Sequence, residues 1–209
     1  MKHVFLSAAL LGAFVSPAAA SLVINVDGAI GSGFTTWTFS GSAVARDSGR
    51  FSADDTFQSA EQFFDLGDFT DVDSFDVPDN GGAVFGNAVI SVDTQLRNID
   101  AILIDDDNTG LDDLGIGVDG NRDLAFDLGD LVAWSGVLTV EGIDIGDLDE
   151  GGLGQTFTTS FFGGNRRDAL DLQLVIGGAE IAPVPLPASL PMLLAALGGA
   201  GWMARRKRV

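Results

Sequence analysis

The densest group of side chains that could do chemistry lies in one acidic segment, residues 105–113. It reads DDDNTGLDD, so carboxylates and a hydroxyl surround a single glycine. Calcium binds six to eight oxygen ligands, and loops of this composition supply them from alternating positions while glycine makes the sharp turn. In the register of an EF-hand loop, ligand positions one, three, five and nine would be Asp105, Asp107, Thr109 and Asp113.

The last ligand of that register is missing. Position twelve is Ile116, where an EF-hand loop has a bidentate glutamate. A carboxylate from elsewhere, such as Asp119 or Asp123, would have to replace it. Without one, the segment is an acidic and strongly hydrated loop. Both interpretations stay open, so Ca²⁺ is a candidate cofactor and no cofactor is certain.

Catalytic chemistry has little support in this sequence. The only histidine, His3, lies in a segment expected to be removed on export, which excludes Ser-His and Cys-His nucleophilic sites and histidine-bound zinc in the mature protein. No Gly-rich phosphate loop follows a strand pattern. A glycosidase needs only two carboxylates, and 30 acidic residues supply many pairs by chance. We expect no enzyme, with a two-carboxylate polysaccharide-degrading enzyme as an alternative.

Aromatic side chains are a further type of candidate site, because rings on a solvent-facing sheet could stack on sugars. The candidates are Trp37, Trp134 and Phe161-Phe162. Aromatics inside apolar strand patterns are more often core residues, so we expect these to be core, Trp134 above all. The corresponding alternative function is a secreted, calcium-stabilised carbohydrate-binding module.

The charge of the chain restricts its partners. The net charge is -19, and the part between the two termini carries all 30 acidic residues against six basic ones, or about -24. Such a charge disfavours nucleic acid and anionic membrane surfaces as partners. There is no cysteine, so packing and any bound ions must stabilise the fold without disulfides.

Short strand-like runs separated by turn residues must position these side chains. Apolar and polar residues alternate within many runs, and Gly, Asn and Asp clusters separate them. Residues 53–64 fit a short helix or an extended loop equally well. The pattern predicts an all-β fold, an antiparallel β-sandwich of jelly-roll type, with strands at 22–26, 35–39, 75–77, 83–92, 99–104, 131–140, 156–162 and 170–176.

A six-residue pattern recurs three times, at residues 64–69, 126–131 and 143–148. Each copy reads apolar, Asp, apolar, Gly, Asp, apolar. Aspartate bonds to nearby backbone and glycine adopts positive φ, so the pattern favours a tight turn beside a strand. The irregular separations argue against a repeat architecture.

The N-terminal residues 1–20 have the pattern of a secretory signal peptide. Lys2 provides the positive region, residues 4–15 are apolar, and the small residues Ala18 and Ala20 form an A-x-A cleavage site. We expect a signal helix here and a mature chain that begins at Ser21.

The C-terminal residues form three parts in a fixed order. The proline-containing hexapeptide Val184–Ser189 precedes fifteen apolar positions, 190–204, and a basic tail of Arg205, Arg206, Lys207 and Arg208. As a helix the apolar part would reach about 22 Å against roughly 30 Å of hydrocarbon. Snorkelling side chains and local bilayer thinning would allow a single transmembrane helix, with the basic tail in the cytoplasm. The alternative is a core helix.

This layout resembles the PEP-CTERM sorting signals, and Val184, Pro185, Leu186, Pro187, Ala188 and Ser189 resemble the signature of the VPLPA-CTERM variant. The resemblance covers residues 184–209. It implies an exported protein of a Gram-negative bacterium that a membrane-embedded exosortase recognises. The Gram-positive sortase motif LPxTG fits less well, because Ser189 stands where threonine belongs and Leu190 where glycine belongs.

These observations give a plan of three parts: signal peptide at 1–20, acidic β-sandwich domain at 21–180, and sorting signal at 181–209. The resemblance implies transient anchoring in the inner membrane and then a place on the cell surface or outside the cell. It also implies a structural or interaction role in extracellular matrix or exopolysaccharide. The expected partners are the secretion machinery, the sorting enzyme and extracellular polysaccharide.

Overall fold

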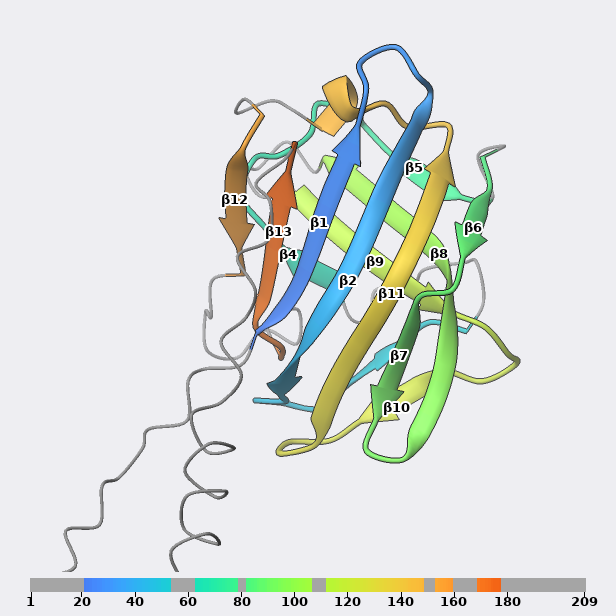
Figure 1. The fold of residues 1–209 in the computed structure, drawn as a ribbon. Coiled ribbons are helices and arrows are strands. Elements are labelled where there is room, and N and C mark those ends of the chain that lie inside the picture. Colours follow the sequence, from blue (N-terminus) through green and yellow to red (C-terminus); the bar gives the residue numbers. More distant parts are fainter. Residues whose placement is uncertain are drawn as a thin grey trace, which may run out of the picture. The chain divides into compact units, whose positions relative to one another are not determined.

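Alternating apolar residues form two facing layers of β-strands (Figure 1). The computed structural model describes residues 21–53, 63–78, 82–106, 112–148, 153–159 and 169–177. The predicted signal peptide, the sorting signal and most of the segment of ambiguous helix propensity, 54–62, lie outside these ranges. Residues 20–183 form a compact unit of their own.

Thirteen strands and one 3₁₀ helix are present in the described residues. In chain order they are β1 (Leu22–Gly28), β2 (Phe34–Val44), β3 (Gly49–Phe51), β4 (Phe63–Asp65), β5 (Phe75–Val77), β6 (Val84–Gly86), β7 (Val89–Val92), β8 (Gln95–Asp106), β9 (Asp112–Val118), β10 (Leu124–Phe126), β11 (Leu131–Glu141), η1 (Ile145–Leu148), β12 (Gln155–Thr158) and β13 (Leu172–Ile176).

Eleven of the strands belong to one curled sheet in the order β12-β13-β1-β2-β11-β7-β8-β9-β4, with β5 paired to β8 and β6 to β11. A separate two-stranded sheet joins β10 and β3. Figure 1 shows a front layer from β12 to β11 with β6 and β7, and a layer behind it with β9, β4 and β5. Strand β8 connects the layers: residues 95–98 pair with β7, and residues 99–106 pair with β9.

A cluster of buried aromatic rings packs the two layers together. Trp134 of β11 makes edge contacts with Phe39 of β2 and with Phe64 of β4, at ring-centroid distances of 5.2 and 6.1 Å. The indole N–H of Trp134 donates to the carbonyl of Ser40 at 3.0 Å, and that of Trp37 donates to Thr35 Oγ1 at 2.8 Å. Both polar groups are therefore satisfied inside the core.

The predicted all-β fold is confirmed. Each of the eight predicted runs contains a strand, and one pairing is parallel, that of β1 with β13. The predicted strand 83–92 is two strands, β6 and β7, which pair with β11 in the same register and are separated by Asn87 and Ala88. Gly136 of β11 has φ +117° there, and a Cβ on it would lie 2.6 Å from the Cα of Ala88.

Four short or acidic strands, β3, β4, β9 and β10, have no counterpart among the predicted runs. Strands β3, β4 and β10 have three residues each, too few for a periodic signal. Strand β9 begins with Asp112 and Asp113, which made it look like a loop. The sandwich depends on β9, since it pairs with both β8 and β4.

Candidate functional sites

Two of the four predicted calcium ligands lie opposite each other in paired strands. Asp105 of β8 and Asp113 of β9 are register partners, so their Cα atoms are about 4.5–5.5 Å apart and their side chains share a face. Asp107 and Thr109 lie outside the described residues. The described residues of the segment, 105–106 and 112–113, therefore belong to paired strands and not to an open loop.

The prediction that Asp119 could replace the missing calcium ligand is wrong, because Asp119 follows the far end of β9. Six strand positions separate it from Asp113, which is about 20 Å. Its carboxylate accepts hydrogen bonds from the backbone N–H and the side-chain amide of Asn98, at 3.0 and 2.6 Å. Asp123 accepts from the Ala53 N–H at 3.2 Å and forms an ion pair with Arg50 at 3.1 Å.

Within the described ranges, no group of three or more His, Cys, Asp or Glu side chains could hold a metal ion. The calcium site at Asp105, Asp107, Thr109 and Asp113 accordingly stays a prediction.

A buried carboxylate that the sequence analysis missed lies beside this hairpin. Asp112 is fully buried, and its Oδ2 accepts hydrogen bonds from the backbone N–H groups of Phe69 and Thr70 at 2.5 and 2.7 Å. Its other oxygen, Oδ1, has no hydrogen-bond partner among the described residues. The alternation of β9 carried a signal for this burial, since Asp112 is in phase with the core residues Leu114 and Ile116.

Burial raises the pKa of Asp112 above 3.8. The two N–H donors lower that pKa, while the charges of Asp68 and Asp106 raise it further. Asp106 is the cross-strand partner of Asp112, so two carboxylates share one face at this end of the β8–β9 pair. A buried carboxylate with two donors and an unsatisfied oxygen is suited to hold backbone segments together, at some cost in desolvation.

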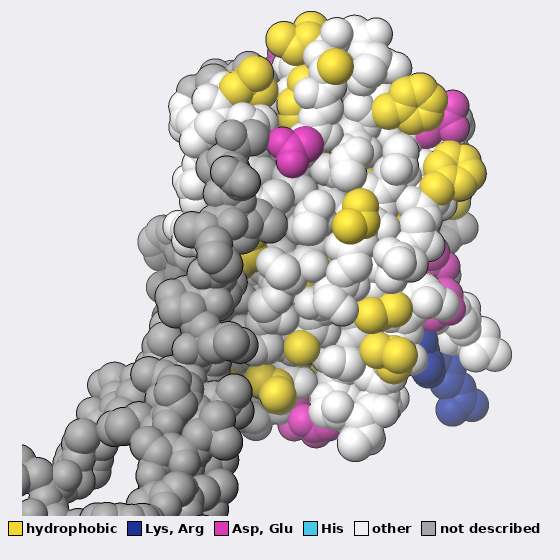
Figure 2. Space-filling model, in the orientation of Figure 1, with side chains coloured by type: hydrophobic (Ala, Val, Ile, Leu, Met, Phe, Trp, Pro, Cys, Tyr) yellow, Lys and Arg dark blue, Asp and Glu magenta, His cyan; other side chains and the backbone are white. Residues whose placement is uncertain are grey.

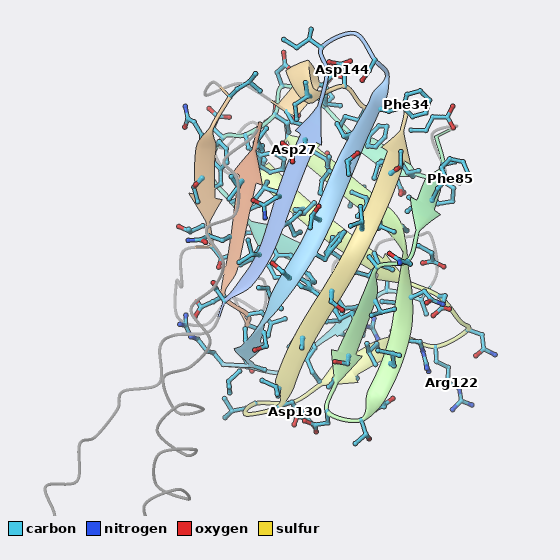
Figure 3. All side chains as sticks on the ribbon, viewed as in Figure 1. Asp27, Phe34, Phe85, Arg122, Asp130 and Asp144 are labelled. Carbon is cyan, nitrogen blue, oxygen red and sulfur yellow. The ribbon has the colours of Figure 1, made fainter. Side chains whose placement is uncertain are left out.

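Hydrogen bonds continue from Asp112 across one end of the sandwich. The hydroxyl of Thr70 donates to the backbone carbonyl of Asp147 at 2.7 Å. Asp147 in turn accepts from the Asp144 N–H at 2.8 Å, and Asp144 accepts from the N–H groups of Gly33 and Gly146 at 3.2 and 3.0 Å. Figure 3 places Asp144 at the end of the front layer where β1 turns into β2.

The pKa of Asp144 is lowered, because the Gly146 N–H and further backbone donors from residues 31–33 stabilise its charged form. Asp144 thereby ties the β1–β2 turn to helix η1. The chemistry available at this end of the molecule is acceptance of backbone hydrogen bonds, which is structural.

The recurring six-residue pattern forms the same turn in two of its three copies. Asp130 and Asp147 each accept, at 2.8 Å, the backbone N–H of the aspartate three positions earlier. Each also donates its own N–H to that residue's carbonyl at 3.0 Å. The predicted tight turn is confirmed for these copies. In the copy at 64–69, the N–H of Phe69 donates to Asp112.

The aromatic candidates Trp37 and Trp134 are core residues, as predicted. Phe161 and Phe162 lie outside the described residues. Two phenylalanines that the sequence analysis did not consider, Phe34 and Phe85, are instead about half exposed, at 46% and 56%. The phase of β2 carried this signal for Phe34, because it alternates with the buried Thr35 and Trp37.

Residues 183–208 match the PEP-CTERM protein-sorting motif. No curated protein and no solved structure matches the chain. The part of the chain that the structure describes contains no helix long and apolar enough to span a membrane. The fold and the motif together define an exported β-sandwich protein with a C-terminal sorting signal.

The chain thus carries a PEP-CTERM sorting motif, which supports an exported protein that is sorted by an exosortase-type enzyme. The resemblance of its C-terminal residues is confirmed at this level. The VPLPA variant, the roles of Val184 to Ser189 and of Arg205 to Arg208, and the signal cleavage at Ser21 stay predictions, because these residues, apart from Ser21 itself, lie outside the described ranges.

Proposed function

We propose that this protein is a non-enzymatic component of the extracellular matrix, displayed at the cell surface or released from it after processing of its C-terminal signal. The observation that carries the proposal is the PEP-CTERM motif at residues 183–208 on a chain whose remaining body is an acidic β-sandwich. A sorting signal acts as a substrate or a tether, so the contribution of the mature protein comes from the folded body.

The distribution of charge along the chain supports a body that faces away from the cytoplasm. All 30 acidic residues lie outside the motif, while four of the 11 basic residues close it. Basic residues beside a span stay in the cytoplasm, so the body faces away from it. A body with this much negative charge stays soluble and avoids anionic lipid surfaces, which suits a component of a hydrated matrix.

Processing is tested by the intact mass of the protein recovered from the envelope and from the medium of its native host. We expect a chain that begins at Ser21 and ends near Pro187 or Ser189. A mass that runs through Val209 in the membrane fraction would overturn processing and leave a plainly anchored protein.

A variant with Arg205, Arg206, Lys207 and Arg208 changed to Gln sharpens this test. We expect its processing to fail or slow, because the cytoplasmic stop is lost. The matched control is the Arg166→Gln, Arg167→Gln variant, which removes two positive charges outside the motif and should be processed normally. Equal processing of both variants would remove the basic tail from the proposed signal.

The matrix role is tested by fractionation. We expect the processed protein to sediment with cell-free exopolysaccharide and to be released when that polysaccharide is digested. Recovery only as free protein in the medium would contradict a matrix role without affecting the sorting result.

A further inference from the structure

Charged residues avoid the front layer of the sandwich. The seven strands β12, β13, β1, β2, β11, β6 and β7 contain two charged residues, Asp27 and Glu141, and neither Lys nor Arg. Both are acidic and lie at the same end of the layer: Asp27 is the last residue but one of β1, and Glu141 is the last residue of β11. Strands β4, β5 and β9 of the other layer, by contrast, carry Asp65, Asp76 and the Asp112-Asp113 pair. In a chain of net charge -19, this segregation leaves one sheet face nearly neutral.

The strand register arranges the exposed side chains of that face in lateral rows. One row runs Asp27, Thr36, Thr139 and Phe85 across β1, β2, β11 and β6. A second row pairs Phe34 with Glu141, and a third pairs Thr38 with Val137 beside the buried Asn25. Figure 2 shows this face as mostly neutral, with separate hydrophobic side chains and few acidic ones.

Two aromatic rings flank strand β11, which lies next to the border of the face. Phe34 and Phe85 lie on the strands either side of β11, two residue positions apart along it, so their Cα atoms are about 10 Å apart across the sheet and about 7 Å along it. They share one side of the sheet, because Glu141 and Thr139, their partners in β11, are two positions apart. Figure 3 shows both rings at the same border of the layer.

The surface near the two rings combines threonine hydroxyl groups with apolar side chains. Thr36 and Thr139 form a cross-strand pair beside Phe85, and Thr38 pairs with Val137, which is 42% exposed. A hydroxyl both donates and accepts a hydrogen bond, so each threonine can meet a partner group of either kind. Aromatic rings provide large contact area at low cost in side-chain entropy.

We propose that this face, centred on Phe34, Thr36, Thr139 and Phe85, binds an uncharged polysaccharide. The inference rests on the proposed function and names its partner class and its site. A neutral glycan offers hydroxyl groups to the threonines and apolar C–H faces to the two rings, and it needs no counter-charge. An anionic polymer would face a chain of net charge -19 and a layer without a single Lys or Arg. A folded protein partner is disfavoured, because stable interfaces are enriched in Arg and aromatic clusters and bury about 800 Å² per partner.

The test uses the purified full chain in detergent micelles. Binding is measured by affinity electrophoresis in soluble neutral glycans, namely β-glucan, xylan and dextran, and by pull-down on cellulose and chitin, with alginate as the anionic comparison. We expect binding to at least one neutral glycan and none to alginate. Binding to alginate alone, or to no glycan of the panel, overturns the proposal.

The site is tested with the Phe34→Ala, Phe85→Ala double variant. Its affinity should fall at least about tenfold, the loss typical of truncated aromatic anchors. The matched control is Ile30→Ala, Leu128→Ala, which removes two side chains that are more exposed, at 74% and 71%, and lie in turns. The Phe34→Trp, Phe85→Trp variant should keep or strengthen binding, which a merely structural role of the rings does not predict.

Circular dichroism establishes that each variant is folded. Unchanged affinity in the folded Ala variant, or equal losses in the control, overturns the site. A change from dimer to monomer in that variant, measured by light scattering without any glycan binding, would show that the face joins two copies of the chain. These outcomes are independent of the processing experiment, so failure of this inference and failure of the sorting proposal can be told apart.

Discussion

Asp112 holds Thr70 by a charge-assisted hydrogen bond inside the protein. The carboxylate Oδ2, at the start of β9, accepts the Thr70 N–H at 2.7 Å and the Phe69 N–H at 2.5 Å. Thr70 then reaches the carbonyl of Asp147 through its own hydroxyl. One buried acidic residue therefore couples the back layer to the loop that precedes β5 and to helix η1.

Replacing Asp112 by Ala should lower the free energy of unfolding by about 2–4 kcal/mol. Two buried N–H groups lose their acceptor, each at about 1–3 kcal/mol, while removal of a buried charge offsets part of that loss. Asp112→Asn keeps an acceptor oxygen and should stay within about 1 kcal/mol of the parent. Urea denaturation at pH 7 measures both variants. The control is Asp127→Ala, an exposed aspartate, and equal stability of Asp112→Ala and the parent would disprove the coupling.

Asp112 should also affect how the stability of the protein depends on pH. Burial raises the pKa of Asp112 above its unfolded value of 3.8, so the folded state binds that proton more tightly. Its contribution is fully present below pH 3.8 and is lost as pH rises through the folded-state pKa. The stability of the parent relative to Asp112→Asn should therefore fall as pH rises above about 4. A relative stability that is constant or increases over this range would refute the assignment.

Asp144 should behave in the opposite way. Backbone donors, first that of Gly146, lower the pKa of Asp144 below 3.8, so its contribution is present above that pH and is lost as pH falls through the folded-state value. The stability of the parent relative to Asp144→Asn should shrink in acid. Hydrogen exchange at Gly33 and Gly146 gives a local reading, and both amides should exchange faster in the variant.

The two equivalent turns allow a matched comparison. Asp130→Ala and Asp147→Ala each remove a side chain that accepts the N–H three positions earlier, and each should cost about 0.5–2 kcal/mol, as losses of comparable caps do. Asp127→Ala removes the other aspartate of one turn, whose backbone alone takes part, and should cost less. Thermal unfolding ranks the three variants. A larger effect for Asp127→Ala would mean that the pattern works through different contacts.

Two glycines with similar backbone angles should respond differently to alanine. Gly136 has φ +117° and no room for a Cβ beside Ala88, whereas Gly129 has φ +95° and nothing within 4 Å. Gly129→Ala should cost about 1–2 kcal/mol from backbone strain alone. Gly136→Ala should cost clearly more, because the β6–β7 edge must also move. Equal losses on denaturation would show that close approach of the strands is unimportant there.

Much of this arrangement was readable from individual residues. The alternation in β2 and β11 predicted both strands and the burial of Trp37 and Trp134. The Asp-x-Gly-Asp spacing predicted the turns at Asp130 and Asp147, because those hydrogen bonds span three residues. The PEP-CTERM motif was readable for the same reason, since it is a continuous segment. Features formed by residues close together in the chain can be predicted from the sequence.

Strand β9 could not be predicted from the sequence pattern. Its first two residues are aspartates, and acidic side chains normally avoid strands, so the segment resembled a calcium-binding loop. Pairing with β8 and β4 on both sides, and the donors of Phe69 and Thr70, outweigh that preference. Phe69 and Thr70 lie more than 40 residues away from Asp112, and no local pattern reports them.

The sequence by itself determined the all-β class, the burial of the tryptophans, the Asp-Gly turns and the exported, exosortase-sorted character of the chain. Only the tertiary structure decided that Asp112 is buried against Thr70 and that Asp119 is far from Asp113. It also decided that Phe34 and Phe85 flank a nearly neutral sheet face. The physical reason is range: propensity, turn chemistry and sorting signals act over a few residues, whereas register, burial and the shared face of two strands arise from pairing between distant segments.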